Sequence, residues 1–91
     1  MDEFVLWEGK ANLKIGMAKI AGELTITNKR ISFKALSKNT EIRISEIKNV
    51  DMAGKIIKRI RIETSGKEYS FFIPHAKEVL ELIKRFIRED L

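Results

Sequence analysis

The chain of 91 residues contains no cysteine and no glutamine, and it has a single histidine and a single proline. Without cysteine, a disulfide framework and a thiolate metal site are both excluded. A single histidine lacks the partners that a catalytic base or a metal ligand needs. No glycine-rich phosphate-binding loop is present, since the glycines are scattered along the sequence. These absences predict a protein that is not an enzyme and that holds no metal or cofactor.

Long apolar runs and a basic leader are missing as well. No stretch approaches the roughly 18 apolar residues that a membrane-spanning helix needs. Residues 1–4 are acidic and lack the basic start and apolar core of a signal peptide. The length predicts one domain over residues 1–91. We therefore expect a cytoplasmic protein, with the inner face of the membrane as a further location if the chain binds lipid.

Positive charge is present but unevenly distributed. The net charge is +5, and residues 29–48 carry six lysines or arginines against two glutamates. Residues 55–61 carry four such cations and no acid. Clustered positive charge favours anionic partners such as phospholipid or nucleic acid, and the alternative is a solvated strand face. Isoleucine, lysine and glutamate dominate the composition, a bias that is typical of heat-adapted proteins.

Residues 22–33 have the most informative pattern in the chain. Apolar and polar residues alternate on both sides of Asn28-Lys29, which predicts two strands joined by a two-residue turn. Such a turn requires a positive φ, which we assign to Asn28. One register then satisfies both faces of the hairpin, with the pairs Leu24–Phe33, Ile26–Ile31, Thr25–Ser32 and Glu23–Lys34.

Similar alternation predicts the remaining elements, which are a lead-in at 4–8, a first strand at 11–17, strands at 41–44 and 50–52, a hairpin of 55–63 with 67–73, and a helix at 75–90. We expect Trp7 in the lead-in to plug one end of the core. A turn at 37–40 then sets Phe33 opposite Ile44 and leaves Lys34 beside Arg43. Between the strands at 41–44 and 50–52, Ser45-Glu46-Ile47 redirects the chain.

The last hairpin and the helix complete this pattern. The hairpin turns at Ser65-Gly66 and predicts the pairs Ile60–Phe71, Ile62–Tyr69, Arg61–Ser70 and Arg59–Phe72. Pro74 suits the start of a helix, and we interpret His75 as a capping or surface residue. The helix has an apolar stripe at three- and four-residue spacing, formed by Ala76, Val79, Leu80, Ile83, Phe86 and Ile87.

The motif Gly-x-Leu-x-Ile-Thr-Asn-Lys-Arg-Ile-x-Phe at 22–33 resembles the second and third strands of the GRAM and bacterial PH-like families. The similarity covers residues 8–88 and includes Ile42-x-Ile44-x-x-Ile47-x-x-Val50 and Ile60-x-Ile62-x-Thr64-x-Gly66-x-x-Tyr69-x-Phe71. It implies a mainly β fold of the pleckstrin-homology class: a seven-stranded, partly open barrel of two near-orthogonal antiparallel sheets, capped by one C-terminal helix. Such barrels support many unrelated functions.

The resemblance also implies a candidate site for lipid headgroups. Many PH domains that bind phosphoinositides use basic residues along the first two strands and their connecting loop. The matching positions in this chain are Lys10, Lys14 and Lys19. Their spacing is wide, so weak adhesion to anionic lipid is expected, at about 1 kcal/mol for each basic residue.

The second candidate site is a basic strand. It is formed by Lys55, Lys58, Arg59 and Arg61, with Phe72 beside Arg59. Cations next to an exposed aromatic ring are able to bind a membrane, a nucleic acid or a protein. Nucleic acid is disfavoured, because it requires several outward aromatic rings and only Phe72 is predicted to point outward.

The third candidate is an interface with another protein or a second copy of the chain. A barrel that is split at one corner leaves strand edges, and the short strand at 50–52 has little charge to protect it. Leu82 projects off the helix stripe, and Trp7 is large for so small a core. The sequence thus predicts a non-catalytic binding or adaptor module that mediates protein contact or self-association, with anionic membrane lipid bound through the basic strand as the alternative.

Overall fold

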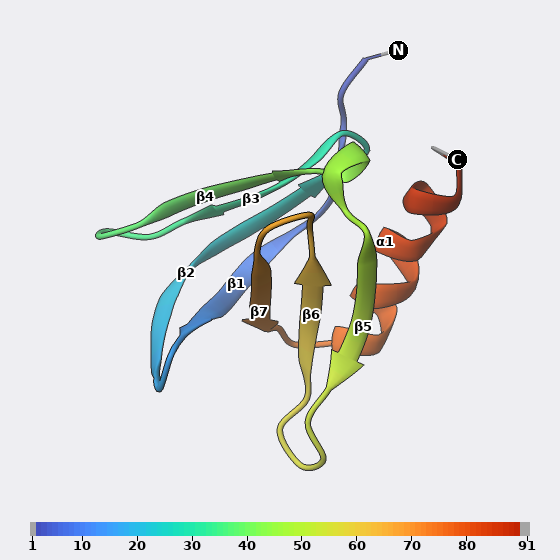
Figure 1. The fold of residues 1–91 in the computed structure, drawn as a ribbon. Helices are drawn as coiled ribbons and strands as arrows, with labels where there is room; N and C mark the ends of the chain where they lie inside the picture. Colours follow the sequence, from blue (N-terminus) through green and yellow to red (C-terminus); the bar gives the residue numbers. More distant parts are fainter. Residues whose placement is uncertain (1, 90–91) are drawn as a thin grey trace.

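A computed structural model of the chain describes residues 2–89, in which seven strands precede one helix (Figure 1). The elements are β1 (Val5–Ile15), β2 (Ala18–Thr27), β3 (Arg30–Lys34), β4 (Asn39–Arg43), the 3₁₀ turn η1 (Ile44–Glu46), β5 (Asn49–Ala53), β6 (Arg59–Glu63), β7 (Glu68–Phe72) and α1 (Ala76–Glu89). The helix predicted at 75–90 is present as α1 but begins at Ala76, since His75 lies in the preceding turn with a φ of 58°, and residue 90 lies outside the described residues.

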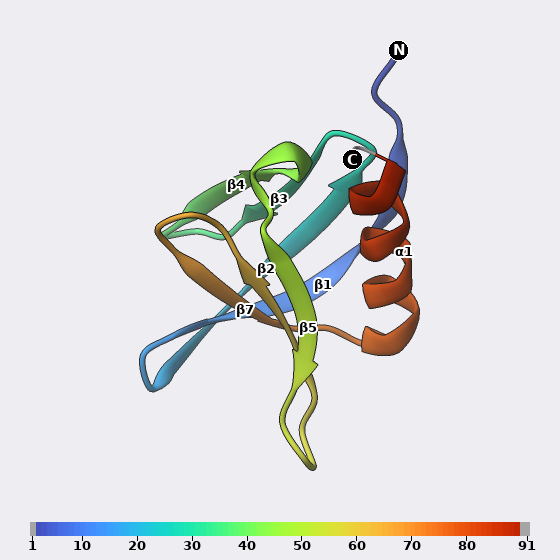
Figure 2. The same ribbon diagram turned by 45° about the vertical axis from the view of Figure 1, so that its right-hand side comes forward.

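All seven strands belong to one antiparallel sheet, in the order β4-β3-β2-β1-β7-β6-β5. The long strand β1 pairs with β2 along its whole length and with β7 near Asn12 and Leu13, so it links the two halves of the sheet. Figures 1 and 2 show the β1–β4 half lying across the β5–β7 half, with α1 beside β5. The two predicted sheets are thus halves of one continuous sheet, and β4 and β5 are its free edges.

The core lies between the two halves and α1. Leu24 and Phe33 of one half, Phe71 of the other, and Val79 of the helix are all at most 1% exposed and belong to one cluster. The rings of Phe33 and Phe71 meet at a centroid distance of 5.6 Å and an interplanar angle of 52°. Full burial of one such apolar side chain stabilises the fold by roughly 1.5–3 kcal/mol. The two halves of the sheet and the helix therefore share one interior.

The β2–β3 hairpin has the predicted register, from Glu23–Lys34 to Ile26–Ile31. The turn of this hairpin differs from the predicted one. The φ of Asn28 is not positive, because His75 is the only residue other than glycine with a positive φ among those described. Instead the Thr27 hydroxyl oxygen accepts hydrogen bonds from the N–H groups of Lys29 and Arg30, at 3.1 and 3.0 Å. A side-chain acceptor thus replaces the left-handed turn.

The predicted pairing of β3 with β4 is wrong. Phe33 lies opposite Thr40 rather than Ile44, and Lys34 lies opposite Asn39 rather than Arg43. The β3–β4 loop lies earlier in the chain than predicted, because the Ala35 N–H donates to the Lys38 carbonyl at 2.9 Å. The shift is an even number of residues, so the same side chains still face inward. After β4, the turn predicted at residues 45–47 is confirmed by η1.

The predicted plug at residues 4–8 is also wrong. The segment from Val5 onward is the start of β1, with an irregularity in the pairing between Val5 and Trp7. These residues form a strand because β2 is long enough to pair with all of β1. Trp7 lies partly buried against the core, and its ring covers Gly9, where an added Cβ would lie 2.9 Å from ring atoms.

The β6–β7 hairpin has the predicted pairs Ile60–Phe71 and Ile62–Tyr69, but β6 begins at Arg59 and not at Lys55. Ala53 pairs with Arg59, so residues 54–58 form a hairpin loop between β5 and β6. Gly54 has a φ of 92°, and a Cβ there would lie 2.2 Å from the carbonyl oxygen of Ile57. The tight turn at Gly54 is therefore what removes residues 55–58 from the strand.

Candidate functional site

The structure does not assemble the predicted basic strand as one face. Lys55 and Lys58 are exposed in the β5–β6 loop, whereas Arg59 and Arg61 lie in β6 and are partly buried. The Nε atom of Arg59 is buried without a hydrogen-bond partner among the described residues. Of these four cationic residues, only Lys55 and Lys58 are therefore exposed to solvent.

Arg61 is engaged by an acidic neighbour on β5. Its Nε and Nη2 atoms donate to the two carboxylate oxygens of Asp51 at 3.0 and 2.7 Å, and Glu63 approaches to 3.8 Å. The hydrogen bonds from Arg61 hold the pKa of Asp51 below its ordinary value. A paired guanidinium of this kind is a poor candidate for an anion-binding group, so the assignment of Arg61 to the site is not supported by its contacts.

Phe72 has a cationic neighbour that was not predicted. The ammonium of Lys19 lies 4.1 Å from the centroid of the Phe72 ring, and Phe72 pairs with Asn12 on β1. Lys19 thereby covers one face of the ring. A ring occupied in this way offers little to a nucleic acid base.

The lysines implied by the resemblance are only partly brought together. Lys14 and Lys19 are cross-strand partners next to the β1–β2 turn, where Gly16 has a φ of 59°. Lys10 lies farther along β1, with Glu23 as its cross-strand partner. The exposed cations near the turn are thus Lys14 and Lys19.

Exposed apolar side chains at hairpin ends were not predicted from the sequence. Met17, Leu36 and Ile56 are 94% exposed or more, and Ile57 is 61% exposed. A signal for the β5–β6 loop existed in the sequence. Adjacent isoleucines in a strand point to opposite faces, so Ile56-Ile57 between two lysines does not fit a half-buried strand. The adjacent exposed isoleucines make the β5–β6 loop a candidate interaction site.

Two of these apolar ends lie at the same end of the molecule. Figures 1 and 2 both show the β1–β2 turn and the β5–β6 loop at the lower end, with the β3–β4 loop set apart from them. We call these two hairpin ends the tips: residues 15–19 in the β1–β2 turn and residues 54–58 in the β5–β6 loop. Each tip carries exposed apolar side chains next to lysines: Met17 beside Lys19, and Ile56 and Ile57 between Lys55 and Lys58.

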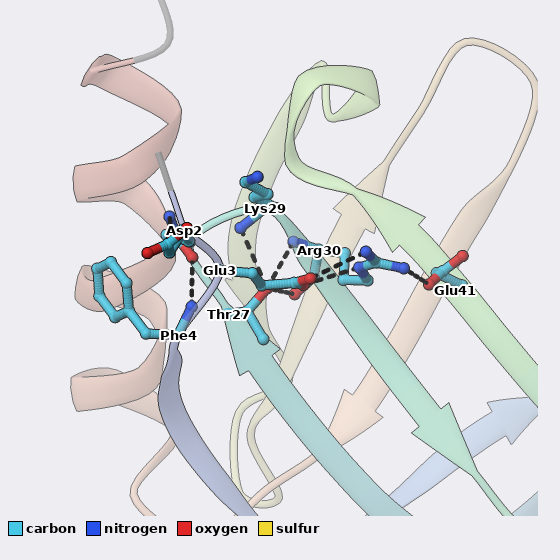
Figure 3. Close-up of polar contacts among 8 residues, drawn as sticks. Asp2, Glu3, Phe4, Thr27, Lys29, Arg30 and Glu41 are labelled. Carbon is cyan, nitrogen blue, oxygen red and sulfur yellow. Dashed lines mark hydrogen bonds and ion pairs between the residues drawn. The ribbon is translucent and has the colours of Figure 1, made fainter.

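A separate polar cluster ties the residues before β1 to the β2–β3 turn (Figure 3). The Phe4 N–H donates to Asn28 Oδ1 at 2.9 Å, and the Asn28 side-chain amide donates to the Asp2 carbonyl at 3.1 Å. The Asn28 N–H donates to the Phe4 carbonyl at 3.4 Å. Asn28 thus fixes the start of the chain to the turn.

Glu3 is the charged part of the same cluster (Figure 3). Arg30 donates two hydrogen bonds to its carboxylate, at 2.8 and 2.9 Å, and the Thr27 hydroxyl donates a third at 2.7 Å. Arg30 also donates to Glu41 at 2.7 Å. The hydrogen bonds from Arg30 hold the pKa of Glu3 below its ordinary value.

We expect Glu3→Gln to lower the melting temperature slightly at neutral pH and to flatten its decline in acid. A carboxyl whose folded pKa is depressed contributes stability above its unfolded pKa and loses it as the pH falls through the folded pKa. The pair is exposed, so the effect is small and is reduced by salt. Thermal unfolding across an acid series measures it, with the exposed Glu46→Gln as control. Identical profiles for Glu3→Gln and the wild type would contradict this account.

Among residues 2–89, no helix is long and apolar enough to cross a membrane, and no group of three or more potential metal ligands is present. No family model matches the chain, and no curated protein matches it in sequence. Solved structures do match. The N-terminal PH domain of human ARAP2 has a TM-score of 0.77 at 13% identity, covering 92% of this chain and 80% of that domain. This chain has the pleckstrin-homology fold.

Two further structures support the PH-like fold. The Vps36 N-terminal PH domain has a TM-score of 0.73 at 14% identity, over 96% of this chain and 80% of that one. The C-terminal domain of an unknown protein from Leishmania infantum has a TM-score of 0.80 at 18% identity, over 93% of this chain and 85% of that one. At such low identities the similarity establishes the fold alone.

Proposed function

We propose that this PH-like chain is a non-catalytic binding module that attaches to anionic membrane surfaces through its two tips. The observation that carries the proposal is the exposure of Ile56 and Ile57, 94% and 61%, between Lys55 and Lys58 on a protruding loop. Apolar side chains at the end of a loop fit the acyl region of a bilayer, while adjacent lysines fit anionic headgroups. The location that follows is the cytoplasmic face of a membrane.

Each side chain of the tips contributes modestly to the free energy of membrane binding. Full burial of an isoleucine or methionine side chain contributes roughly 1.5–3 kcal/mol. Each lysine near an anionic surface contributes about 1 kcal/mol. One tip alone gives marginal affinity after the cost of association. Both tips lie toward the lower end of the molecule (Figure 1). The proposal is therefore that one membrane surface contacts both tips together.

The proposal modifies the site predicted from sequence. Lys55, Lys58 and Lys14 remain in it, since they lie in or next to a tip. Arg61 is excluded by its pairing with Asp51, and Lys10 lies opposite Glu23. Within the PH-like fold we also propose a GRAM-type chain, which rests on the motif at residues 22–33 and its matching hairpin register.

Protein contact or self-association through a strand edge has weaker support. The free edge strand β4 carries the charged Glu41 and Arg43, which discourage pairing with another chain. The other edge strand, β5, carries Asp51 and packs against α1. Trp7 packs against the core and is not free to form an interface. These contacts make the tips the better-supported binding surface.

Sedimentation with vesicles of phosphatidylcholine and phosphatidylserine tests the proposal. We expect Ile56→Ser/Ile57→Ser to weaken binding at least about tenfold, because most of the apolar contribution of one tip is lost. Leu36→Ser is the matched control, since Leu36 is equally exposed at the β3–β4 loop, away from the tips. Equal binding by the tip variant and the wild type would overturn the proposal.

A charge variant completes this test. Lys55→Glu/Lys58→Glu is expected to abolish binding at physiological salt, and the wild type is expected to release vesicles as salt rises. Light scattering at two protein concentrations tests the alternative, which is self-association. A concentration-dependent dimer that survives both tip variants, combined with no vesicle binding, would favour self-association.

A further inference from the structure

A hollow lies at the opposite end of the molecule from the tips, where the β2–β3 turn meets η1. It has a volume of about 360 Å³ and is lined by Asn28, Lys29, Arg30, Arg43, Ile44 and Ser45. The Ile44 N–H donates to the Lys29 carbonyl at 2.9 Å, so the two walls are bonded to each other. Figures 1 and 2 both show this turn and η1 close together at the upper end.

Three cationic residues, Lys29, Arg30 and Arg43, line this hollow. Arg30 and Arg43 lie directly opposite each other on β3 and β4, where like charges destabilise a sheet. Arg30 is occupied by Glu3 and Glu41. Arg43 and Lys29 are exposed, and neither forms an ion pair with a carboxylate of residues 2–87, whose side chains the structure describes. Glu3 is the acid whose pKa the charge of Lys29 helps to lower. The two unpaired cations therefore leave local positive charge that an anion is able to neutralise.

The lining is held in place before any ligand arrives. Thr27 accepts hydrogen bonds from the N–H groups of Lys29 and Arg30, and Asn28 is fixed by the residues before β1. Ile44 is 4% exposed and supplies an apolar floor, whereas Ser45 offers an exposed hydroxyl. The backbone of the lining is thus fixed before binding, whereas the exposed side chains of Lys29, Arg43 and Ser45 lose rotamer freedom when a ligand binds.

We propose that this hollow binds a phosphomonoester. The guanidinium of Arg43 matches two phosphate oxygens, Lys29 supplies a point charge, and the Ser45 hydroxyl donates a further hydrogen bond. The volume falls within the range of roughly 300–1,000 Å³ found for small-molecule sites and exceeds the need of a bare phosphate. The hollow therefore leaves room for a small organic group attached to the phosphate. This proposal does not depend on membrane attachment, because its residues are separate from the tips.

An NMR titration with inorganic phosphate, matched in ionic strength by sodium chloride, tests the site. We expect saturable shifts of the amide signals of Lys29, Arg43 and Ser45. Arg43→Gln is expected to weaken binding about tenfold, as for the loss of a charged hydrogen bond. This variant is expected to fold, since Arg43 is exposed and its removal relieves repulsion with Arg30. Lys67→Gln in the exposed β6–β7 turn changes the net charge equally and is expected to bind as the wild type.

Two further arms distinguish the source of the phosphate group. Saturation by glycerol 3-phosphate, with no effect of glycerol, supports a soluble ligand. The second arm titrates the Ile56→Ser/Ile57→Ser variant with phosphatidic acid vesicles. Saturable binding that is weakened by adding Arg43→Gln supports a lipid headgroup that is held independently of the tips. Shifts that follow ionic strength without saturating, or equal weakening by Lys67→Gln and Arg43→Gln, overturn the proposal. If the protein binds phosphate but does not bind vesicles, only the proposal of membrane attachment is contradicted.

Discussion

Phe71→Ala is expected to lower the free energy of unfolding by about 3–5 kcal/mol, the range for removing a fully buried phenylalanine. Phe71 is 0% exposed and contacts Phe33 across the two halves of the sheet. Its loss removes apolar burial and leaves a cavity between the β1–β4 half and the β5–β7 half. Urea denaturation monitored by circular dichroism gives the change, with the slope of the transition reporting whether unfolding remains two-state.

The matched control is Phe4→Ala, because Phe4 is 49% exposed before β1. We expect this change to stay within about 1 kcal/mol, since little buried surface is lost. A loss of less than about 1 kcal/mol for Phe71→Ala would show that the two halves do not share the core described above. Equal losses for the two variants would lead to the same conclusion.

Gly22→Ala is expected to cost about 1–3 kcal/mol, as for overpacking of a filled core. A Cβ at Gly22 would lie 2.5 Å from the carbonyl oxygen of Lys34 and 2.6 Å from the Phe33 ring. The first of these atoms belongs to the paired backbone of β3, which has little freedom to move. The destabilisation therefore arises from displaced strands and not from the φ angle of this glycine.

Gly66→Ala is the internal control for that variant. A Cβ at Gly66 meets no atom within 4 Å, and the residue lies in the exposed β6–β7 turn. Thermal unfolding of both variants under one set of conditions is expected to separate them clearly. Should Gly22→Ala be as stable as Gly66→Ala, the close approach of Phe33 to β2 would be incorrect.

The sequence predicted the hairpins whose faces are set by a local turn. The β2–β3 register follows from alternation around Asn28-Lys29, and the β6–β7 register follows from alternation around Ser65-Gly66. Both faces of each hairpin constrain the pairing, so a slip by one residue would expose the core side. The β3–β4 register was predicted wrongly because a slip by an even number of residues preserves the buried face.

The candidate site was less accessible from the sequence. Lys55 and Lys58 were identified, but as part of a strand, because the break in alternation at Ile56-Ile57 was not interpreted as a loop after Gly54. The pairing of Arg61 with Asp51 depends on which strands are neighbours, and this information is not local in the sequence. The hollow beside Arg43 depends likewise on the bond between Ile44 and Lys29.

The central claim is that the two tips contact a membrane, and spin-labelled lipids test it most directly. A label near the headgroups broadens the amide signals of residues close to the bilayer surface. In anionic bicelles we expect the strongest broadening at Ile56, Ile57 and Met17, with little effect at Leu36. Broadening that is strongest on α1 or on β4, or the absence of any broadening in anionic bicelles, would contradict the account.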